Sequence, residues 1–98
     1  ARKMMVAAAL NPAIIIDCSH GNSRKNWERQ ARVLRSVIDQ RCWGETSIRG
    51  FMLESNLKAG KQCIGENPSN LAYGLSVTDG CIGWEETERI LTGVQLPL

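Results

Sequence analysis

The sequence predicts an α/β fold with parallel strands, because segments typical of buried strands alternate with segments typical of helices. Three short apolar runs, at residues 13–16, 48–53 and 75–78, each end in polar or turn-forming residues. Helical periodicity follows the first run, and a second helical segment lies near the end of the chain. Strand-to-helix units in this order favour parallel strands with right-handed crossovers. Periodicity leaves two architectures open, part of a doubly wound sheet or an arc of a (β/α) barrel.

The first two elements are a helix and a strand. Residues 2–10 are good helix formers, and Asn11-Pro12 supplies the stop signal expected just after a helix. Residues 13–16 (AIII) form a continuous apolar run rather than an alternating one, which is typical of a strand covered on both faces. The strand leads into a polar cluster at residues 17–23 (DCSHGNS).

A long amphipathic helix is expected from about residue 25 to residue 43. Its apolar positions recur at offsets of four, three, four and four, and therefore share one face: Trp27, Ala31, Leu34, Ile38 and Cys42. Asn22 or Ser23 can cap the first turn, and Gly44 is placed to end the helix in a left-handed conformation.

The second half of the chain repeats the strand signal around a long loop. Residues 48–53 (IRGFML) are expected to form a second buried strand that ends at Glu54. Residues 57–74 are rich in glycine and small polar residues and predict a long loop, a feature that is usually functional. A third strand at 75–78 ends at Asp79, and a last helix at 84–94 is expected to turn these side chains inward: Trp84, Ile90, Leu91 and Val94.

Composition excludes several classes of protein. The chain has 98 residues, enough for one small domain or a piece of a larger one, with 43% hydrophobic and 22% charged residues. The net charge of +2 comes from interleaved signs, so we expect no nucleic-acid partner. No apolar run reaches the roughly 20 residues of a membrane span, and no signal peptide is recognisable, which favours a cytoplasmic protein. The chain starts without methionine and within a helical pattern, which suggests an excised piece.

Four cysteines are spread along the chain without any C-x-x-C pair: Cys18, Cys42, Cys63 and Cys81. This spacing predicts neither a zinc knuckle nor a thioredoxin motif. An even number permits two disulfides, but the α/β pattern is typical of an intracellular enzyme, and free thiols are expected.

The functional signal is a metal-capable side chain after each predicted strand, namely His20, Glu54 and Asp79. The carboxyl ends of parallel strands gather at one rim, where active sites are built. One imidazole and two carboxylates suit manganese, iron, cobalt or zinc, and a cation with an open position can act as a Lewis acid. Asp17, Ser19 or Asn22 can orient the histidine. Taken singly, each of the three has an ordinary explanation, as a loop histidine, a solvated charge or a turn residue.

Three segments resemble the type I 3-deoxy-D-arabino-heptulosonate-7-phosphate (DAHP) synthases, in the order and spacing of that family. They are residues 16–23 (IDCSHGNS), 52–56 (MLESN) and 73–85 (YGLSVTDGCIGWE), and the similarity extends over essentially the whole chain. Gly80 departs slightly from the family pattern, in which alanine is as frequent.

The resemblance implies a (β/α)8 TIM barrel of which residues 1–98 supply the C-terminal three β/α units as one partial domain. It also implies that His20, Glu54 and Asp79 bind a divalent metal ion. The family is a transferase of the shikimate pathway, which leads to the aromatic amino acids, and condenses phosphoenolpyruvate with erythrose 4-phosphate. Its fourth metal ligand, a cysteine, and most of its phosphate-binding residues come from an earlier part of the family's chain, so the fragment alone is expected to be inactive.

Alternatives from other classes stay open. The chain could be a noncatalytic module, either a regulatory remnant or a piece prepared for crystallisation, or part of another metal-dependent aldolase or hydrolase on the same barrel. Three strands of an eight-stranded barrel leave unpaired edges and an uncovered face, so self-association is expected. The sequence does not identify the native metal, the amino acid that inhibits the enzyme, or the catalytic residues beyond the metal ligands.

Overall fold

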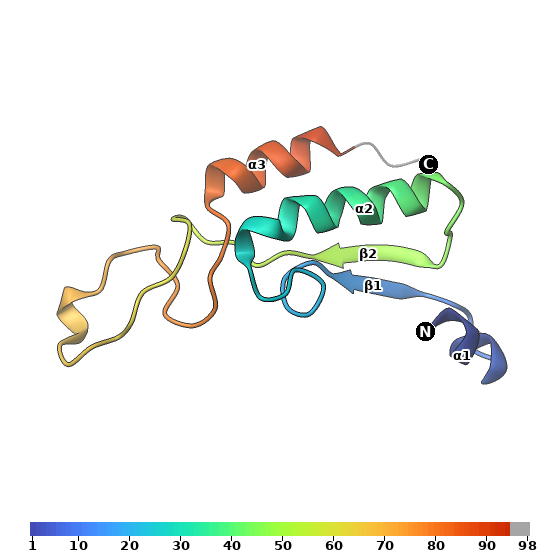
Figure 1. The fold of residues 1–98 in the computed structure, drawn as a ribbon, viewed down its shortest axis with the longest axis horizontal. Helices are drawn as coiled ribbons and strands as arrows, with labels where there is room; N and C mark the ends of the chain where they lie inside the picture. The colour runs from blue at the N-terminus through green and yellow to red at the C-terminus, as the bar shows by residue number, and fades with distance from the viewer. Residues whose placement is uncertain (95–98) are drawn as a thin grey trace.

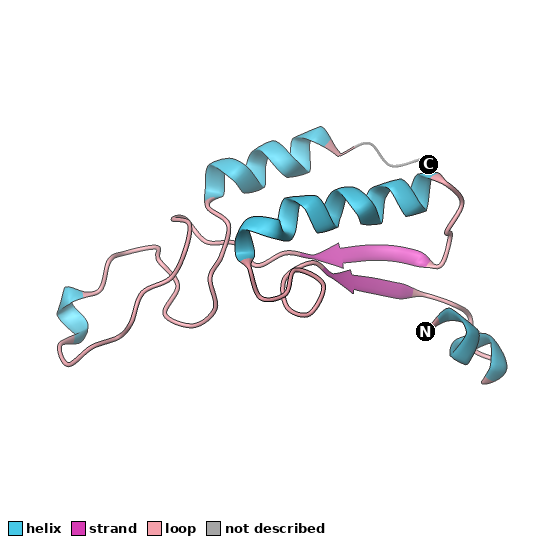
Figure 2. Cartoon of the chain, viewed as in Figure 1, coloured by secondary structure: helices cyan, strands magenta, loops and turns pink. Residues whose placement is uncertain are grey.

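The order of elements follows the predicted alternation of helices and strands. The structure, a computed structural model, describes residues 1–94. In chain order its elements are α1 (Arg2–Ala7), β1 (Ile14–Asp17), the 3-10 helix η1 (Trp27–Arg29), α2 (Gln30–Cys42), β2 (Ile48–Met52), the 3-10 helix η2 (Pro68–Asn70) and α3 (Trp84–Gly93). Figure 2 shows that helix and loop predominate over strand.

The strand pair β1 and β2 is parallel, and α2 is the crossover between the two strands. Figure 1 shows α2 alongside the strand pair and α3 beside α2. The register runs from Ile14 opposite Ile48 to Asp17 opposite Met52, with one irregularity after Ile14. Both strands therefore end at the same side of the sheet, as parallel pairing requires.

A small core lies between the strands and the helices. Its buried members are Cys18, Leu34, Val37 and Ile48. Partly buried side chains from all these elements pack against them: Ile16, Val33, Ile38, Phe51, Leu53, Ile90 and Val94. The expectation that the strand at residues 13–16 is covered on both faces is wrong. The helices cover one face, and Ile15 on the other face is 71% exposed.

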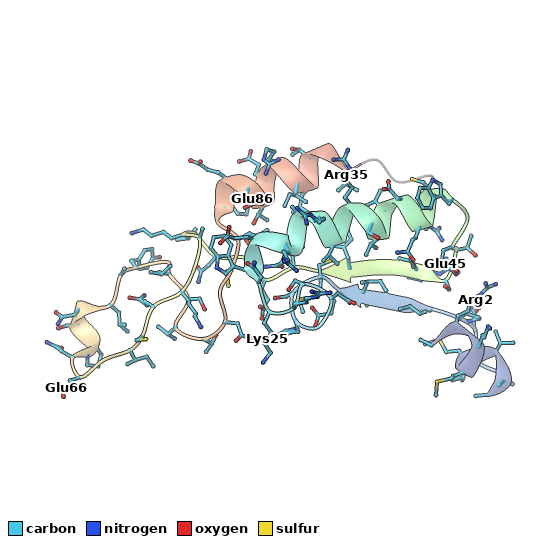
Figure 3. All side chains as sticks on the ribbon, viewed as in Figure 1. Arg2, Lys25, Arg35, Glu45, Glu66 and Glu86 are labelled. Atoms are coloured by element: carbon cyan, nitrogen blue, oxygen red, sulfur yellow. The ribbon has the colours of Figure 1, made fainter. Side chains whose placement is uncertain are left out.

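Residues 57–75 form an extended excursion, here named the arm. Figure 1 shows it leading away from the strand pair with η2 near its far end, and Figure 3 places Glu66 at that end. None of its residues is buried. The arm extends along the longest axis of the molecule (Figure 1), whose principal extents are 52 × 30 × 18 Å. The long loop predicted for residues 57–74 is confirmed.

The predicted strand at residues 75–78 is not formed within residues 1–94. Ser76 makes only an isolated bridge with Lys61, and the parallel bridge that follows joins Ser55 to Ile82. A strand ladder needs a neighbour that stays in register over several residues. The segment beside residues 75–78 is the irregular arm, which cannot supply one.

Helix boundaries also differ from the prediction. The first helix ends at Ala7 rather than at residue 10. The long helix begins with η1, because Arg24 and Lys25 have φ values of 56° and 58° and are left-handed. Asn26, rather than Asn22 or Ser23, caps η1 by accepting a hydrogen bond from the Glu28 amide. Gly44 has φ of 110°, as its expected left-handed role requires.

Some side chains expected to face inward are exposed. On α2, Leu34 is buried but Cys42 is exposed. On α3, Trp84 is 54% and Leu91 is 48% exposed, whereas Ile90 packs on the core. A helix face becomes buried only where another element covers it, and two strands are too narrow to cover all of both helices. Within the described residues, no helix has both the length and the apolar character to cross a bilayer.

Candidate metal centre

Three side chains predicted from the sequence, those of His20, Glu54 and Asp79, lie together at the rim. One ligand atom from each falls within 4.8 Å of the other two. His20 Nε2 lies 3.3 Å from Glu54 Oε1 and 3.3 Å from Asp79 Oδ2. Two ligands bound at about 2.1 Å from one ion, at angles of about 90–110°, lie about 3.0–3.4 Å apart. The spacing and the donor types therefore fit a divalent cation.

His20 is oriented by the carboxylate of Asp17, the last residue of β1. His20 Nδ1 donates to Asp17 Oδ2 at 2.7 Å, which leaves Nε2 directed at Glu54 and Asp79. A carboxylate on the far nitrogen fixes the ring and its tautomer, an arrangement that is common behind histidine ligands of metals.

The loop after β1 is held by hydrogen bonds to Asp17 and His20. Asp17 Oδ1 accepts from the amides of Ser19 at 2.8 Å and His20 at 3.2 Å. Asn22 Nδ2 donates to the Asp17 carbonyl at 2.8 Å, and the amide of Lys25 donates to the His20 carbonyl at 2.8 Å. Because each bond closes a loop of a few residues, the turn presents His20 in one orientation.

Glu54 follows β2 and is the least exposed of the three, with 25% of its side chain accessible. The hydroxyl of Ser19 donates to Glu54 Oε2, so the other oxygen, Oε1, faces His20. The side-chain amide of Gln30, the first residue of α2, forms hydrogen bonds with both the main-chain amide and the main-chain carbonyl of Glu54.

Asp79 is the most exposed of the three, with 57% of its side chain accessible. It precedes Gly80, which lies directly against the ring of Trp27. A Cβ added to Gly80 would stand 2.1 Å from Trp27 Cδ1, a separation that real atoms do not tolerate. The absence of a side chain at residue 80 therefore allows the Asp79 turn to approach η1.

Charge at the site shifts two pKa values in opposite directions. The hydrogen bond and the negative charge of Asp17 raise the pKa of His20, and Glu54 adds to the effect. The same hydrogen bond lowers the pKa of Asp17. An imidazolium is therefore favoured when the site holds no cation, and a divalent cation would take the place of that positive charge among three carboxylates.

The nearby thiols have a different character. Burial raises the pKa of Cys18 to about 11, and burial also raises the pKa of Cys81. A neutral thiol is a poor metal ligand, because the thiolate is the ligating form. Neither cysteine belongs to the group of potential ligands in the described residues, which comprises His20, Glu54 and Asp79.

Sequence reasoning placed the rim residues but missed two of their supports. The sequence indicates Asp17, Ser19 and Asn22 as neighbours that could orient the histidine. Asp17 bonds the His20 ring, whereas Ser19 bonds Glu54 and Asn22 bonds the Asp17 carbonyl. Gln30 and the contact of Trp27 with Gly80 were not foreseen. A glutamine between apolar helix positions was the available signal for Gln30, because a buried polar side chain needs a partner.

The chain is similar to known proteins over nearly its whole length. The family model described as the DAHP synthetase I family matches residues 1–92. A phospho-2-dehydro-3-deoxyheptonate aldolase of Alternaria alternata is 48% identical over 92 residues, which cover 93% of this chain and 25% of that protein. The Tyr-sensitive phospho-2-dehydro-3-deoxyheptonate aldolase of Escherichia coli is 45% identical over 96 residues, covering 98% of this chain and 27% of that protein.

The fold is also similar to that of a solved structure. The structure of phospho-2-dehydro-3-deoxyheptonate aldolase from Francisella tularensis matches with a TM-score of 0.83 and 43% identity, over 92% of this chain and 26% of that chain. The chain thus spans about a quarter of the length of these relatives.

Proposed function

The chain belongs to the DAHP synthetase I family, and we propose that it is part of a DAHP synthase. The whole enzyme would be a transferase that condenses phosphoenolpyruvate with erythrose 4-phosphate, releasing phosphate, as the first step of aromatic amino acid biosynthesis in the cytoplasm. The observation that carries the proposal is the convergence of His20, Glu54 and Asp79 at one rim in a chain similar to such enzymes over nearly all its length.

We propose further that residues 1–98 supply the last three β/α units of a (β/α)8 barrel. The parallel pair β1 and β2 with its α2 crossover is one such unit and the strand of the next. Residues 75–78, followed by Asp79 and α3, would be the third. Their strand would form once a neighbouring strand from elsewhere in the barrel pairs with them, because parallel strands need that partner.

His20, Glu54 and Asp79 would hold one divalent ion, manganese, iron, cobalt or zinc. Bound there, such an ion supplies Lewis-acid polarisation of a carbonyl oxygen. The chain's own residues prepare the site. Asp17 fixes the His20 ring, Ser19 directs Glu54, and Asn22 restrains the turn through the Asp17 carbonyl. Groups that grip the two phosphates, and a further ligand, would come from the rest of the barrel.

We also propose that the isolated chain self-associates. The edge of β1 opposite β2 has no strand partner within residues 1–94, and Ile15 on the uncovered face is 71% exposed. Open edges and uncovered apolar faces favour pairing with another copy. Sedimentation velocity is expected to show dimers or larger species, and a monodisperse monomer would contradict this.

Titration of the chain with Mn²⁺ tests the site. One ion is expected to bind, and His20→Ala, Glu54→Gln and Asp79→Asn should each weaken binding by more than about 100-fold, because a direct ligand contributes more than an outer contact does. Glu66→Gln changes an exposed carboxylate at the far end of the arm and should leave the affinity unchanged. Absence of binding, or equal losses in all four variants, would contradict the proposed site.

A synthase assay separates this proposal from a noncatalytic module. The intact protein should form DAHP from the two substrates, and the 98-residue chain alone should not, with or without Mn²⁺. An intact protein that binds Mn²⁺ at these residues but acts on neither substrate would favour another metal-dependent aldolase on the same barrel.

A further inference from the structure

Gln30 is a polar side chain in an unusually enclosed place. It is the first residue of α2, and its side chain is fully buried, with 0% of the residue exposed. A buried amide is costly unless both of its ends are hydrogen-bonded. Its two partners therefore indicate what the residue is for.

Both partners of the Gln30 amide belong to the main chain of Glu54. Gln30 Oε1 accepts from the Glu54 amide at 2.7 Å, and Gln30 Nε2 donates to the Glu54 carbonyl at 3.0 Å. The side chain thus bonds Glu54 as a neighbouring strand would. It does so where pairing with β1 has ended, since the last ladder partners are Asp17 and Met52.

The same carbonyl also accepts the amide of Ile82 at 3.0 Å, in the segment that follows Asp79. One peptide group therefore joins α2, the end of β2 and the segment after Asp79. The loop from His20 leads directly into η1 and α2. Glu54 is thus bonded directly to Gln30, and Asp79 lies three residues before Ile82, which bonds the same carbonyl. His20 is joined to Gln30 only through the chain between them.

We propose that Gln30 is a positioning residue of the metal centre, which it serves by fixing the main chain of Glu54 at the exit from β2. This inference rests on the proposed function, because it assumes that Glu54 binds the ion. Without the two hydrogen bonds from Gln30, the Glu54 main chain is less restrained, and its carboxylate no longer meets His20 and Asp79 in one arrangement. Shells behind metal ligands act in this way.

The experiment compares Gln30→Met with Leu34→Val in the 98-residue chain. Met has similar length but neither hydrogen-bonding atom, and Leu34 is the buried residue one helical turn later, which touches the core rather than Glu54. The Mn²⁺ dissociation constant should rise about 10-fold in Gln30→Met and change less than about twofold in Leu34→Val, at temperatures where circular dichroism shows both folded. Gln30→Asn, one methylene too short to reach, should behave like Gln30→Met and replaces it if that variant does not fold.

A second readout needs no metal. Hydrogen exchange of the Glu54 amide, followed by NMR, should accelerate in Gln30→Met more than exchange of the Val37 amide in α2, whereas Leu34→Val should affect both alike. Equal changes in affinity and exchange in the two variants would show a merely structural role and overturn the proposal. If the unsubstituted chain bound no Mn²⁺ while Gln30→Met still accelerated exchange of the Glu54 amide selectively, the proposed metal site would be overturned instead.

Discussion

The β1–α2–β2 unit and the segment from residue 55 to residue 83 bring side chains to the same rim by different means. In the first, a parallel ladder and a buried core fix where each strand ends, and His20 and Glu54 follow directly. In the second, isolated bridges replace the ladder, and the segment has just two buried residues, Ser76 and Ile82. Asp79 is correspondingly the most exposed of the three groups.

The difference shows that a few specific contacts can substitute for regular secondary structure. Two glutamines illustrate it, since each uses both ends of its amide on main-chain groups. Gln30 bonds Glu54, and Gln62 bonds the arm at Ala72 and Leu75. Such contacts are local, so the second region should respond more to single changes at the contacts than to changes elsewhere in the region.

The largest expected contrast is in thiol reactivity. Cys18 lies in the core of the first region, and burial raises the pKa of its thiol to about 11, whereas Cys63 in the arm is exposed. Against the ordinary value of 9.0, that pKa lowers the thiolate fraction near pH 8 by about 100-fold. Iodoacetamide should therefore modify Cys63 at least about 100-fold faster than Cys18, as measured by mass spectrometry. In guanidinium chloride the two should react alike, and similar rates in the native chain would mean that the first region opens readily.

A substitution at Gly80 tests whether the second region is tightly fitted. Gly80→Ala should destabilise the chain by about 1–3 kcal/mol in urea unfolding, because the added Cβ overlaps the Trp27 ring. Gly93→Ala is the control, since a Cβ there meets nothing within 4 Å and alanine is the better helix former.

A double variant assigns the effect to the contact. Trp27→Ala combined with Gly80→Ala should lose less stability than the sum of the single variants, because removing the ring removes the clash. If Gly80→Ala were as harmless as Gly93→Ala, the turn at Asp79 would be loosely packed. The second region would then differ from the first in packing as well as in regular secondary structure.

The predictability of the fold follows the same division. The first region could be read from the sequence because a continuous apolar run, helical spacing and Gly44 are local signals that the structure retains. The strand expected at residues 75–78 failed because strand formation depends on a partner that no local pattern specifies. Cys42 and Leu91 fit a helical face but are exposed, because their burial depends on which element lies opposite.

The candidate site was predictable in its members and in the supports that lie near His20 in the sequence, but not in Gln30. His20, Glu54 and Asp79 are recognisable as polar side chains that end apolar runs, and the family resemblance selects the same three. Gln30 could not be found in this way, because its partner is a main-chain group 24 residues away. Every residue type except proline offers the same main-chain amide and carbonyl, so the type of residue 54 does not indicate this contact.

A smaller effect is expected from removing the hydrogen bonds of Gln62 in the arm. Gln62 Nε2 donates to the carbonyls of Ala72 and Leu75, and Oε1 accepts from the Ala72 amide, all at 2.9 Å. Gln62→Leu should destabilise the arm by no more than about 1 kcal/mol, since water can reach these groups. Proteolysis within the arm should accelerate by up to about fivefold, while global stability changes little. Gln40→Leu, which removes one exposed bond on α2, is the control, and equal cleavage rates in both variants would show that Gln62 does not restrain the arm.

The smallest effect is expected at His20 and Asp17, because both side chains are about two-fifths exposed, at 41% and 42%, and water screens their attraction. Asp17→Asn should lower the pKa of His20 toward its ordinary value, since the hydrogen bond from His20 to the carboxylate is the main cause of the upward shift. NMR titration of the imidazole in the metal-free chain measures this, with Asp39→Asn, an exposed carboxylate on α2, as the control.

The sign of the pH dependence follows from the two shifts. The raised pKa of His20 stabilises the fold fully below its unfolded value of 6.5, and this contribution is lost as the pH rises through the folded pKa. The lowered pKa of Asp17 stabilises the fold above 3.8, and its contribution is lost as the pH falls through the folded pKa. The pair therefore contributes most between these values. Asp17→Asn should lower stability most in that window and flatten the slopes on either side of it, below 3.8 and above 6.5, and the loss should be smaller at higher pH, where His20 is neutral. A pKa of His20 that does not respond to Asp17→Asn would mean that Glu54 and Asp79, the groups it meets at the rim, determine its charge.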